Sequence, residues 1–160
     1  MRRIVECRRG DSMKATYALA AALLLSAGTV HAQSTIACPT LPAGSGMAWE
    51  KLDGPGYTFC KAIRDSDGQQ VLAVMITGEA PFRPRRSNRT EEAWIDGTGT
   101  WWYSSELSGS TGVEVRETLV ELDRDHVAHI SLRATNEADM SQAMLLAEAL
   151  RFDDVRLSIY

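Results

Sequence analysis

Three side chains in the second half of the chain are of the types that perform acid–base or nucleophilic chemistry. His129 and Ser131 are two positions apart on one expected strand, so their side chains share a face. Glu117 is expected across a hairpin from Ser131. Together they could form a hydrolase site in which histidine acts as the base. The segment has neither the strained turn nor the backbone donors that acyl transfer needs, so a solvated polar face is the preferred interpretation. No catalytic residue is assigned, and His129, Glu117 and Ser131 are kept as candidates for an alternative, a small cell-envelope hydrolase.

The histidines and cysteines do not have metal-ligand spacing. His126 and His129 are three positions apart on an expected strand, so their side chains point to opposite faces and cannot bind one ion together. The two cysteines of the mature chain are expected to form a disulfide, and the aspartates lack the spacing of a calcium loop. The sequence therefore predicts no metal and no cofactor.

A concentrated basic loop favours recognition of an anionic partner. The segment from Gly78 to about Thr90 contains two prolines, which stiffen it, and four arginines, namely Arg83, Arg85, Arg86 and Arg89. Guanidinium groups bind carboxylates and phosphates through paired hydrogen bonds. The alternative is a solvated connector whose arginines pair with the nearby acidic residues Glu79, Glu91 and Glu92.

The aromatic run Trp101-Trp102-Tyr103 supplies a second candidate binding element. On a strand, Trp102 would point to the same side as Ser104 and Glu106, which are polar. An exposed tryptophan could stack on a sugar, contact an arginine or anchor a protein interface. The alternative is that Trp102 is covered by the helix or by the N-terminal arm.

The N-terminus has the pattern of a secretory signal. The apolar segment at 15–27 follows Lys14, and Val30 and Ala32 are the small residues expected before a cleavage site. We predict cleavage after Ala32, with Met13 as a plausible alternative start. The expected organisation is a signal peptide at 1–32, an irregular arm at 33–48 and a single domain at 49–160.

Cleavage leaves Cys38 and Cys60, an even pair in an oxidising compartment, and predicts a disulfide between them. Such a bridge would tie the arm to the first expected strand. One alternative is a lipoprotein anchored at Cys38, because residues 35–38 weakly resemble a lipid-modification box. A periplasmic or secreted protein is the preferred localisation.

The net charge makes nucleic acid an unfavourable partner. The chain has 17 basic and 21 acidic residues, and loss of five and two with the leader leaves a formal charge of −7. This balance and export disfavour nucleic-acid binding. Beyond the leader no apolar run is long enough to span a membrane.

Alternating apolar residues and turn signals predict three hairpins. The strand pairs are 57–64 with 70–77, 92–95 with 100–107, and 113–122 with 126–134, joined at turns rich in Asp and Gly. Residues 108–112 are expected to form a further turn. A last short strand is expected at 155–159.

One amphipathic helix is expected after the strands. Asn136 and Asp139 form its N-terminal cap, and its apolar side is formed by Met140, Ala143, Met144, Ala147 and Leu150. The predicted fold is α+β, a meander of about six antiparallel strands with the C-terminal helix packed on one face. A small β-barrel with a helix is the alternative.

The leading functional hypothesis is an exported, non-enzymatic binding or accessory module, similar in role to an inhibitor or immunity protein. It would recognise another exported protein or an anionic envelope component through the arginine loop and Trp102. The hydrolase above is one alternative. Another is a carrier for an apolar ligand, with a pocket lined by Met75, Met140 and Met144.

Overall fold

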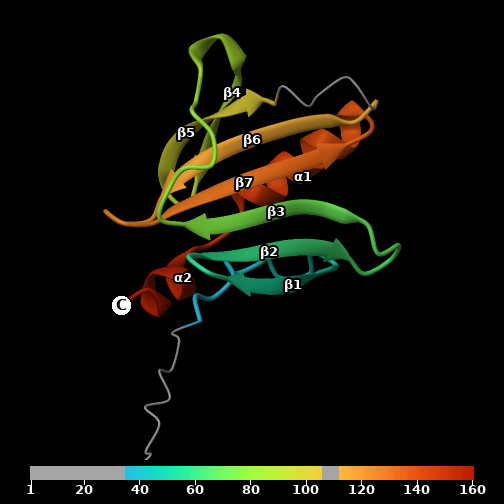
Figure 1. The fold of residues 1–160 in the computed structure, drawn as a ribbon. Coiled ribbons are helices and arrows are strands. Elements are labelled where there is room, and N and C mark those ends of the chain that lie inside the picture. The colour runs from blue at the N-terminus through green and yellow to red at the C-terminus, as the bar shows by residue number, and fades with distance from the viewer. Residues whose placement is uncertain (1–34, 106–111) are drawn as a thin grey trace, which may run out of the picture. The chain divides into compact units, whose positions relative to one another are not determined.

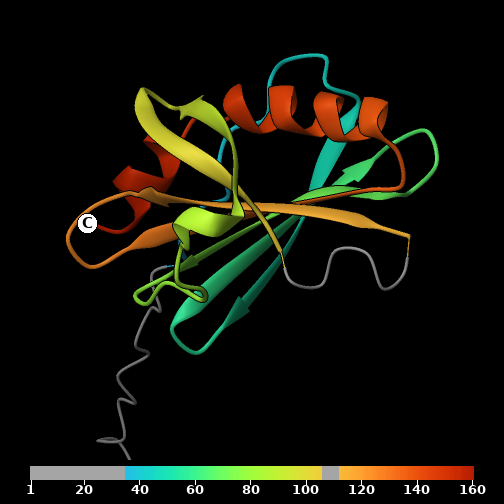
Figure 2. The ribbon, with the colours of Figure 1, turned by 90° about the horizontal axis from the view of Figure 1, so that it is seen from above.

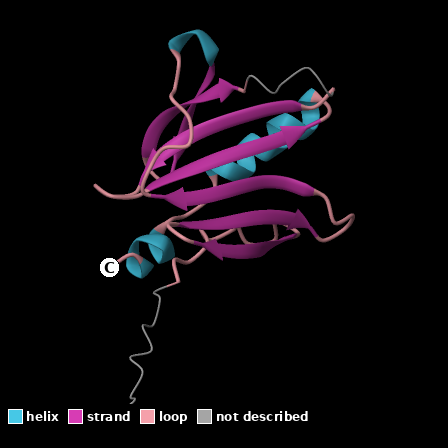
Figure 3. Ribbon diagram, viewed as in Figure 1, coloured by secondary structure: helices cyan, strands magenta, loops and turns pink. Residues whose placement is uncertain are grey.

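Seven antiparallel strands form one sheet in the computed structural model, which describes residues 35–105 and 112–160 (Figure 1). The strands are β1 (Met47–Gly54), β2 (Tyr57–Arg64), β3 (Gln70–Thr77), β4 (Arg89–Ile95), β5 (Thr98–Ser104), β6 (Glu114–Glu121) and β7 (Val127–Ala134). Two helices follow, α1 (Glu137–Glu148) and α2 (Asp153–Ser158), and one turn of 3₁₀ helix, η1 (Arg86–Asn88), precedes β4. The predicted α+β class is confirmed (Figure 3).

The strand order is β1-β2-β3-β7-β6-β5-β4, which differs from a simple meander. After β3 the chain crosses to the far edge of the sheet, where it forms β4. It then returns strand by strand through β5 and β6 to β7, which pairs with β3 (Figure 1). The sheet is open, with β1 and β4 at its edges, so it does not close on itself as the alternative small barrel would require.

The three predicted hairpins are confirmed, and β1 was not among the predicted strands. Gly68 has a φ of +69°, as the β2–β3 turn requires. Between β4 and β5, Asp96 and Gly97 have φ of +49° and +78°, the pattern of a two-residue hairpin turn. The predicted turn at 108–112 and the predicted strand end at Leu107 lie mostly outside the described residues.

Helix α1 covers one face of the sheet (Figure 2). The Asn136 Oδ1 atom accepts a hydrogen bond from the Asp139 N–H at 2.9 Å, which confirms the predicted cap. Met140, Ala143 and Ala147 are buried against alternate residues of the central strands, such as Val74 and Ile130. This face contains the hydrophobic core.

The chain ends in a second helix where a strand was predicted. Residues 153–158 form α2, so the predicted strand at 155–159 is wrong. Only Val155 of α2 is fully buried, and Phe152 is buried just before it. A single buried residue suits a short helix on the surface, whereas a strand would have buried alternate residues.

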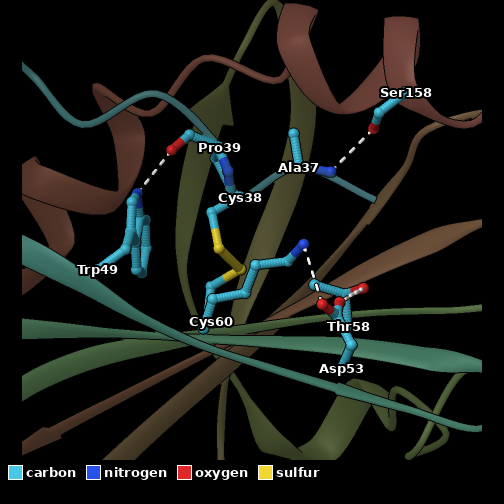
Figure 4. The surroundings of a disulfide bond; sticks show 9 residues. Ala37, Cys38, Pro39, Trp49, Asp53, Thr58, Cys60 and Ser158 are labelled. Atoms are coloured by element: carbon cyan, nitrogen blue, oxygen red, sulfur yellow. Dashed lines mark hydrogen bonds and ion pairs between the residues drawn. A yellow bond between two sulfur atoms is a disulfide. The ribbon is translucent and has the colours of Figure 1, made fainter. Parts of the chain in front are cut away.

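The disulfide between Cys38 and Cys60 is present, with a Cα–Cα distance of 5.9 Å (Figure 4). Around it, the Trp49 indole N–H donates to the Pro39 carbonyl at 2.6 Å, and the Ala37 N–H donates to Ser158 Oγ at 2.9 Å. The bridge fixes the arm against β2, as predicted. Because its sulfur is bonded to Cys60, Cys38 cannot also carry a lipid thioether, so the lipoprotein alternative is wrong for this form.

The structure does not test the predicted signal peptide. Residues 1–32, the predicted signal peptide, lie outside the described residues, and their cleavage stays a prediction. Of the helices in the described part of the chain, neither has the length and hydropathy needed to cross a membrane.

Candidate functional site

The face of the sheet opposite α1 brings the catalytic candidates near one another. His129 and Ser131 lie two apart on β7, and Ser131 pairs directly with Glu117 of β6. The loop between β3 and β4 runs over this side of the sheet, opposite α1 (Figure 2). Its Phe82 ring packs against Tyr103 and His129, with centroid distances of 5.8 and 5.3 Å.

His129 is largely covered and bonded to a carboxylate. Its Nε2 atom lies 3.2 Å from Glu117 Oε2, and both side chains are less than one-fifth exposed. Burial lowers the pKa of His129 from its usual value, because desolvation disfavours the imidazolium, while Glu117 acts in the opposite direction. At neutral pH the ring is therefore mainly neutral.

The geometry around His129 matches the hydrolase alternative only in part. No hydrogen bond in the described part of the chain joins Ser131 to His129, although Ser131 is the required nucleophile. Nε2, the nitrogen through which a base would act, already faces Glu117. The strand backbone there is committed to the β6–β7 and β3–β7 ladders, which leaves no free N–H groups aimed at an oxyanion.

The arginine loop is exposed on the same side of the molecule. Arg83, Arg85, Arg86 and Arg89 are all exposed, and η1 is formed by residues 86–88. Among residues 35–105 and 112–160, Arg83, Arg86 and Arg89 take part in no ion pair, so the alternative pairing with neighbouring glutamates is not seen for these three. Glu91 instead lies 3.8 Å from Arg116.

Trp102 is fully buried, so its proposed role as an exposed aromatic anchor is wrong. It lies on the core face of β5, in the same hydrophobic cluster as residues of α1. The strand alternation was predicted correctly, but the helix covers the side to which Trp102 points. On the same side of β5, Thr100 Oγ1 forms a hydrogen bond with Thr118 Oγ1 at 2.9 Å.

The exposed tryptophan is instead Trp94, and Trp101 beside it is partly exposed. Trp94 is 69% exposed and rests on Gly99, its partner across the β4–β5 pair. The partly exposed Trp101 is a diagonal neighbour on the same face, and the Arg89 guanidinium lies 5.1 Å from its ring centre. We call Arg83, Arg85, Arg86, Arg89, Trp94 and Trp101 the arginine–tryptophan patch.

The exposure of Trp94 follows from the sequence pattern around it. Ala93 and Ile95 flank it, and both are apolar, so strand alternation places Trp94 on the opposite side from two core residues. Residues 92–95 were predicted to form a strand, but the exposed tryptophan was predicted in the aromatic run at 101–103.

The methionine pocket of the carrier hypothesis does not form. Met75 pairs with His129 and therefore lies on the face opposite α1, whereas Met140 lies on α1 and is buried between this helix and the sheet. The three methionines thus line no common cavity. In the described residues, no three His, Cys, Asp or Glu side chains are grouped as a metal site would require.

Comparisons with known proteins add no relative. No family model matches the chain, and neither the curated proteins nor the solved structures compared with it include a significant match.

Proposed function

We propose that this protein is an exported, non-enzymatic binding module that docks an acidic partner protein through the arginine–tryptophan patch. The observation that carries the proposal is the stacking of Arg89 on Trp101 beside the 69% exposed Trp94. Tryptophan and arginine are the residues most enriched among energetic hot spots of protein interfaces. Trp94 lies on the edge strand β4, and Trp101 and the Arg89 guanidinium that contacts it lie beside it on β5 and at the start of β4.

Charge supports an acidic partner. The chain as a whole has a formal charge of −4, whereas residues 79–92 contain four arginines and three glutamates, of which Glu91 lies 3.8 Å from Arg116, so this segment carries a local excess of positive charge. Such a patch orients an acidic partner during encounter, and a guanidinium can bind a carboxylate through two hydrogen bonds. The disulfide supports export, because such bonds persist in oxidising compartments.

The patch is also partly preorganised. Phe82 anchors the loop on Tyr103 and His129, and Pro81 and Pro84 restrict its backbone. Less conformational entropy is then lost when the arginines bind. His129 and Glu117 are thereby given a structural role, supporting the loop from below.

The test is affinity capture from an exported-protein fraction with matched variants. The double variant Arg83→Glu/Arg86→Glu and the single variant Trp94→Ser should each weaken binding of one discrete partner by about 30-fold or more, as hot-spot losses do. Arg124→Glu, in the exposed β6–β7 turn, and Leu157→Ser, on α2, are the controls and should retain the partner. Equal capture by the patch variants and the controls would remove the patch from the proposal.

One observation favours the hydrolase as a second candidate, namely the 3.2 Å contact between His129 and Glu117. If the pair is catalytic, His129→Ala must abolish hydrolysis of peptidoglycan or ester substrates by the wild-type protein. Full activity in that variant, or no activity in the wild type, would leave the pair its supporting role alone.

A further inference from the structure

Strand β1 forms an open edge of the sheet, opposite the edge formed by β4 (Figure 1). All the residues of β1 pair in order with β2, whereas the pairing of β4 with β5 has a register shift between Arg89 and Glu92. Bulges at an edge hinder the addition of another strand. Of the two edges, β1 is therefore the more regular template for a further strand.

The turn after β1 fixes which of its backbone groups point outward. Gly54 and Tyr57 close a two-residue hairpin, so Gly54 and every second residue before it hydrogen-bond to β2. The N–H and C=O groups of Trp49, Lys51 and Asp53 then point away from the sheet. In the described part of the chain, these three residues form no backbone hydrogen bond with the arm or with a loop. β1 thus presents a row of backbone groups to another strand.

A row of apolar side chains ends at this edge. Leu52 pairs with Phe59 of β2, which pairs with Met75 of β3, so the three side chains share the face opposite α1. Phe59 and Met75 are partly buried, but Leu52 is 57% exposed, with no strand of this chain beyond it. An apolar neighbour on the outer side of β1 would bury this leucine.

The charged side chains of β1 are neutralised within the chain. Lys51 Nζ lies 3.1 Å from Asp53 Oδ2, and Glu50 forms an ion pair with Lys61 of β2. Unpaired charges on an edge strand protect it from pairing with another chain. Here each charge has an opposite partner, so that protection is weakened.

One antiparallel register between two β1 strands suits all of these features. A two-fold axis perpendicular to the sheet pairs residues of the same face, so one residue must pair with its own copy. If that residue is Leu52, each Lys51 lies opposite an Asp53, and both direct their backbone groups toward the other strand. Centring the pair on Glu50, Lys51 or Asp53 would instead place like charges directly opposite each other, which is destabilising.

We propose that β1 is a homodimer interface, in which two copies of this chain pair their β1 strands antiparallel about Leu52. The partner is a second copy because the strand complements itself in both its leucine and its charges. The two open sheets then join into one continuous sheet. This interface is separate from the arginine–tryptophan patch, whose tryptophans lie on β4 and β5 toward the other edge.

Sedimentation velocity of the oxidised protein at increasing concentration is the first test. The mean mass should rise from that of a monomer toward that of a dimer between about 1 µM and about 1 mM, as for a small interface. Leu52→Lys places like charges at the axis and should weaken the dimer at least about tenfold. Leu157→Lys, at a leucine 77% exposed on α2, is the matched control and should leave the dimer unchanged.

Charge reversal tests the register. Lys51→Asp sets carboxylates opposite each other, and Asp53→Lys sets ammonium groups opposite each other, so each should weaken the dimer by about three- to tenfold. The double variant Lys51→Asp/Asp53→Lys restores opposite charges and should recover most of the affinity. Asp53→Lys also removes a hydrogen bond from Thr58 Oγ1, so thermal unfolding of each variant is measured in parallel.

Disulfide trapping tests the position of the axis. A facing pair without mutual hydrogen bonds brings its Cα atoms to about 4.5 Å, within the range of a disulfide, so Leu52→Cys should form a covalent dimer on oxidation. Glu50→Cys, exposed on the same face, is the matched control. In the proposed register it lies about 14 Å along the strands from its copy and should not be trapped.

Three results would overturn the proposal. They are a monomeric mass at every concentration, a dimer that Leu52→Lys does not weaken, and equal trapping of Leu52→Cys and Glu50→Cys. A dimer weakened by Trp94→Ser but not by Leu52→Lys would assign the contact to the arginine–tryptophan patch instead.

Discussion

Arg89 and Trp101 show how one contact can shape a surface. The Arg89 guanidinium lies 5.1 Å from the centre of the Trp101 ring, within cation–π range, and a guanidinium can also bind a carboxylate through paired N–H groups. Trp94, which rests on a glycine, extends the same aromatic surface without support from a larger neighbour. Arg89, Trp101 and Trp94 therefore combine a cationic group and aromatic rings on neighbouring positions of β4 and β5.

The burial of Trp102 and the exposure of Trp94 predict that replacing each by alanine changes stability by very different amounts. Trp102→Ala removes a fully buried ring and should lower the free energy of unfolding by about 3–5 kcal/mol. Trp94→Ala removes an exposed ring and should change it by no more than about 0.5 kcal/mol. Urea denaturation of both variants checks this, and similar losses would contradict the burial described here.

His129 predicts a pH dependence of stability. Because burial lowers its pKa in the folded state, the unfolded chain binds the proton first as the pH falls through the ordinary value of 6.5. The free energy of unfolding should therefore decrease between pH 7 and pH 5, and His129→Gln should make this decrease smaller.

Glu117→Gln is the matched variant for that prediction. It removes the carboxylate that favours the imidazolium, so the pKa of His129 should fall further and the decrease in stability should become steeper. Parallel stability curves for the wild type and His129→Gln would contradict the assignment. Denaturant unfolding at a series of pH values provides the measurement.

At the scale of elements, the sequence predicted what depends on neighbours along the chain. The hairpin turns at Gly68 and at Asp96-Gly97 and the cap at Asn136 are set by local backbone and side-chain preferences, and all were found. The alternation of Trp102 was also predicted correctly. The side covered by α1 was not, because it depends on how a distant helix packs.

Two further features depend on long-range contacts and were not predictable. The pairing of β3 with β7 joins strands separated by three others in the sequence. Residues 155–159 contain apolar side chains at both helical and strand spacings, and the choice is made by packing and by an anchor outside the segment. That anchor is Asp96.

Asp96 links the β4–β5 turn to the C-terminal helix. Its Oδ2 atom accepts hydrogen bonds from the Phe152 N–H at 3.3 Å and from the Arg156 guanidinium, and the side chain is 9% exposed. Asp96→Ala should lower the free energy of unfolding by about 1.5–3 kcal/mol, because it leaves Arg156 without this carboxylate. Asp125→Ala, in an exposed turn, is the control, and an equal effect of both would argue against the anchor.

The disulfide makes the arm an element of the fold. A bridge spanning 22 residues stabilises by roughly 3 kcal/mol through the unfolded chain. Cys38→Ser/Cys60→Ser should lose about that amount in chemical denaturation and should speed amide exchange at Ala37 and Thr40, which are hydrogen-bonded to the C-terminal segment. Unchanged exchange at both amides would show that the arm is held by its other contacts.

At the scale of the whole molecule, the described residues from 35 onward form one sheet with α1 on one face and the β3–β4 loop on the other (Figure 2). Trp94 and Trp101 lie on the face opposite α1, because they alternate with the core residues Ala93 and Trp102. Binding at the arginine–tryptophan patch can therefore be tested with variants that leave the hydrophobic core intact.

The central claim is that the protein recognises a partner through the arginine–tryptophan patch. Hydrogen–deuterium exchange of the protein, alone and with the captured partner, tests it most directly, because β4 is an edge strand with unpaired amides. We expect protection concentrated at residues 79–95, with little change in β1 and β2. Protection confined to β1 and β2, or absent from 79–95, would contradict the claim.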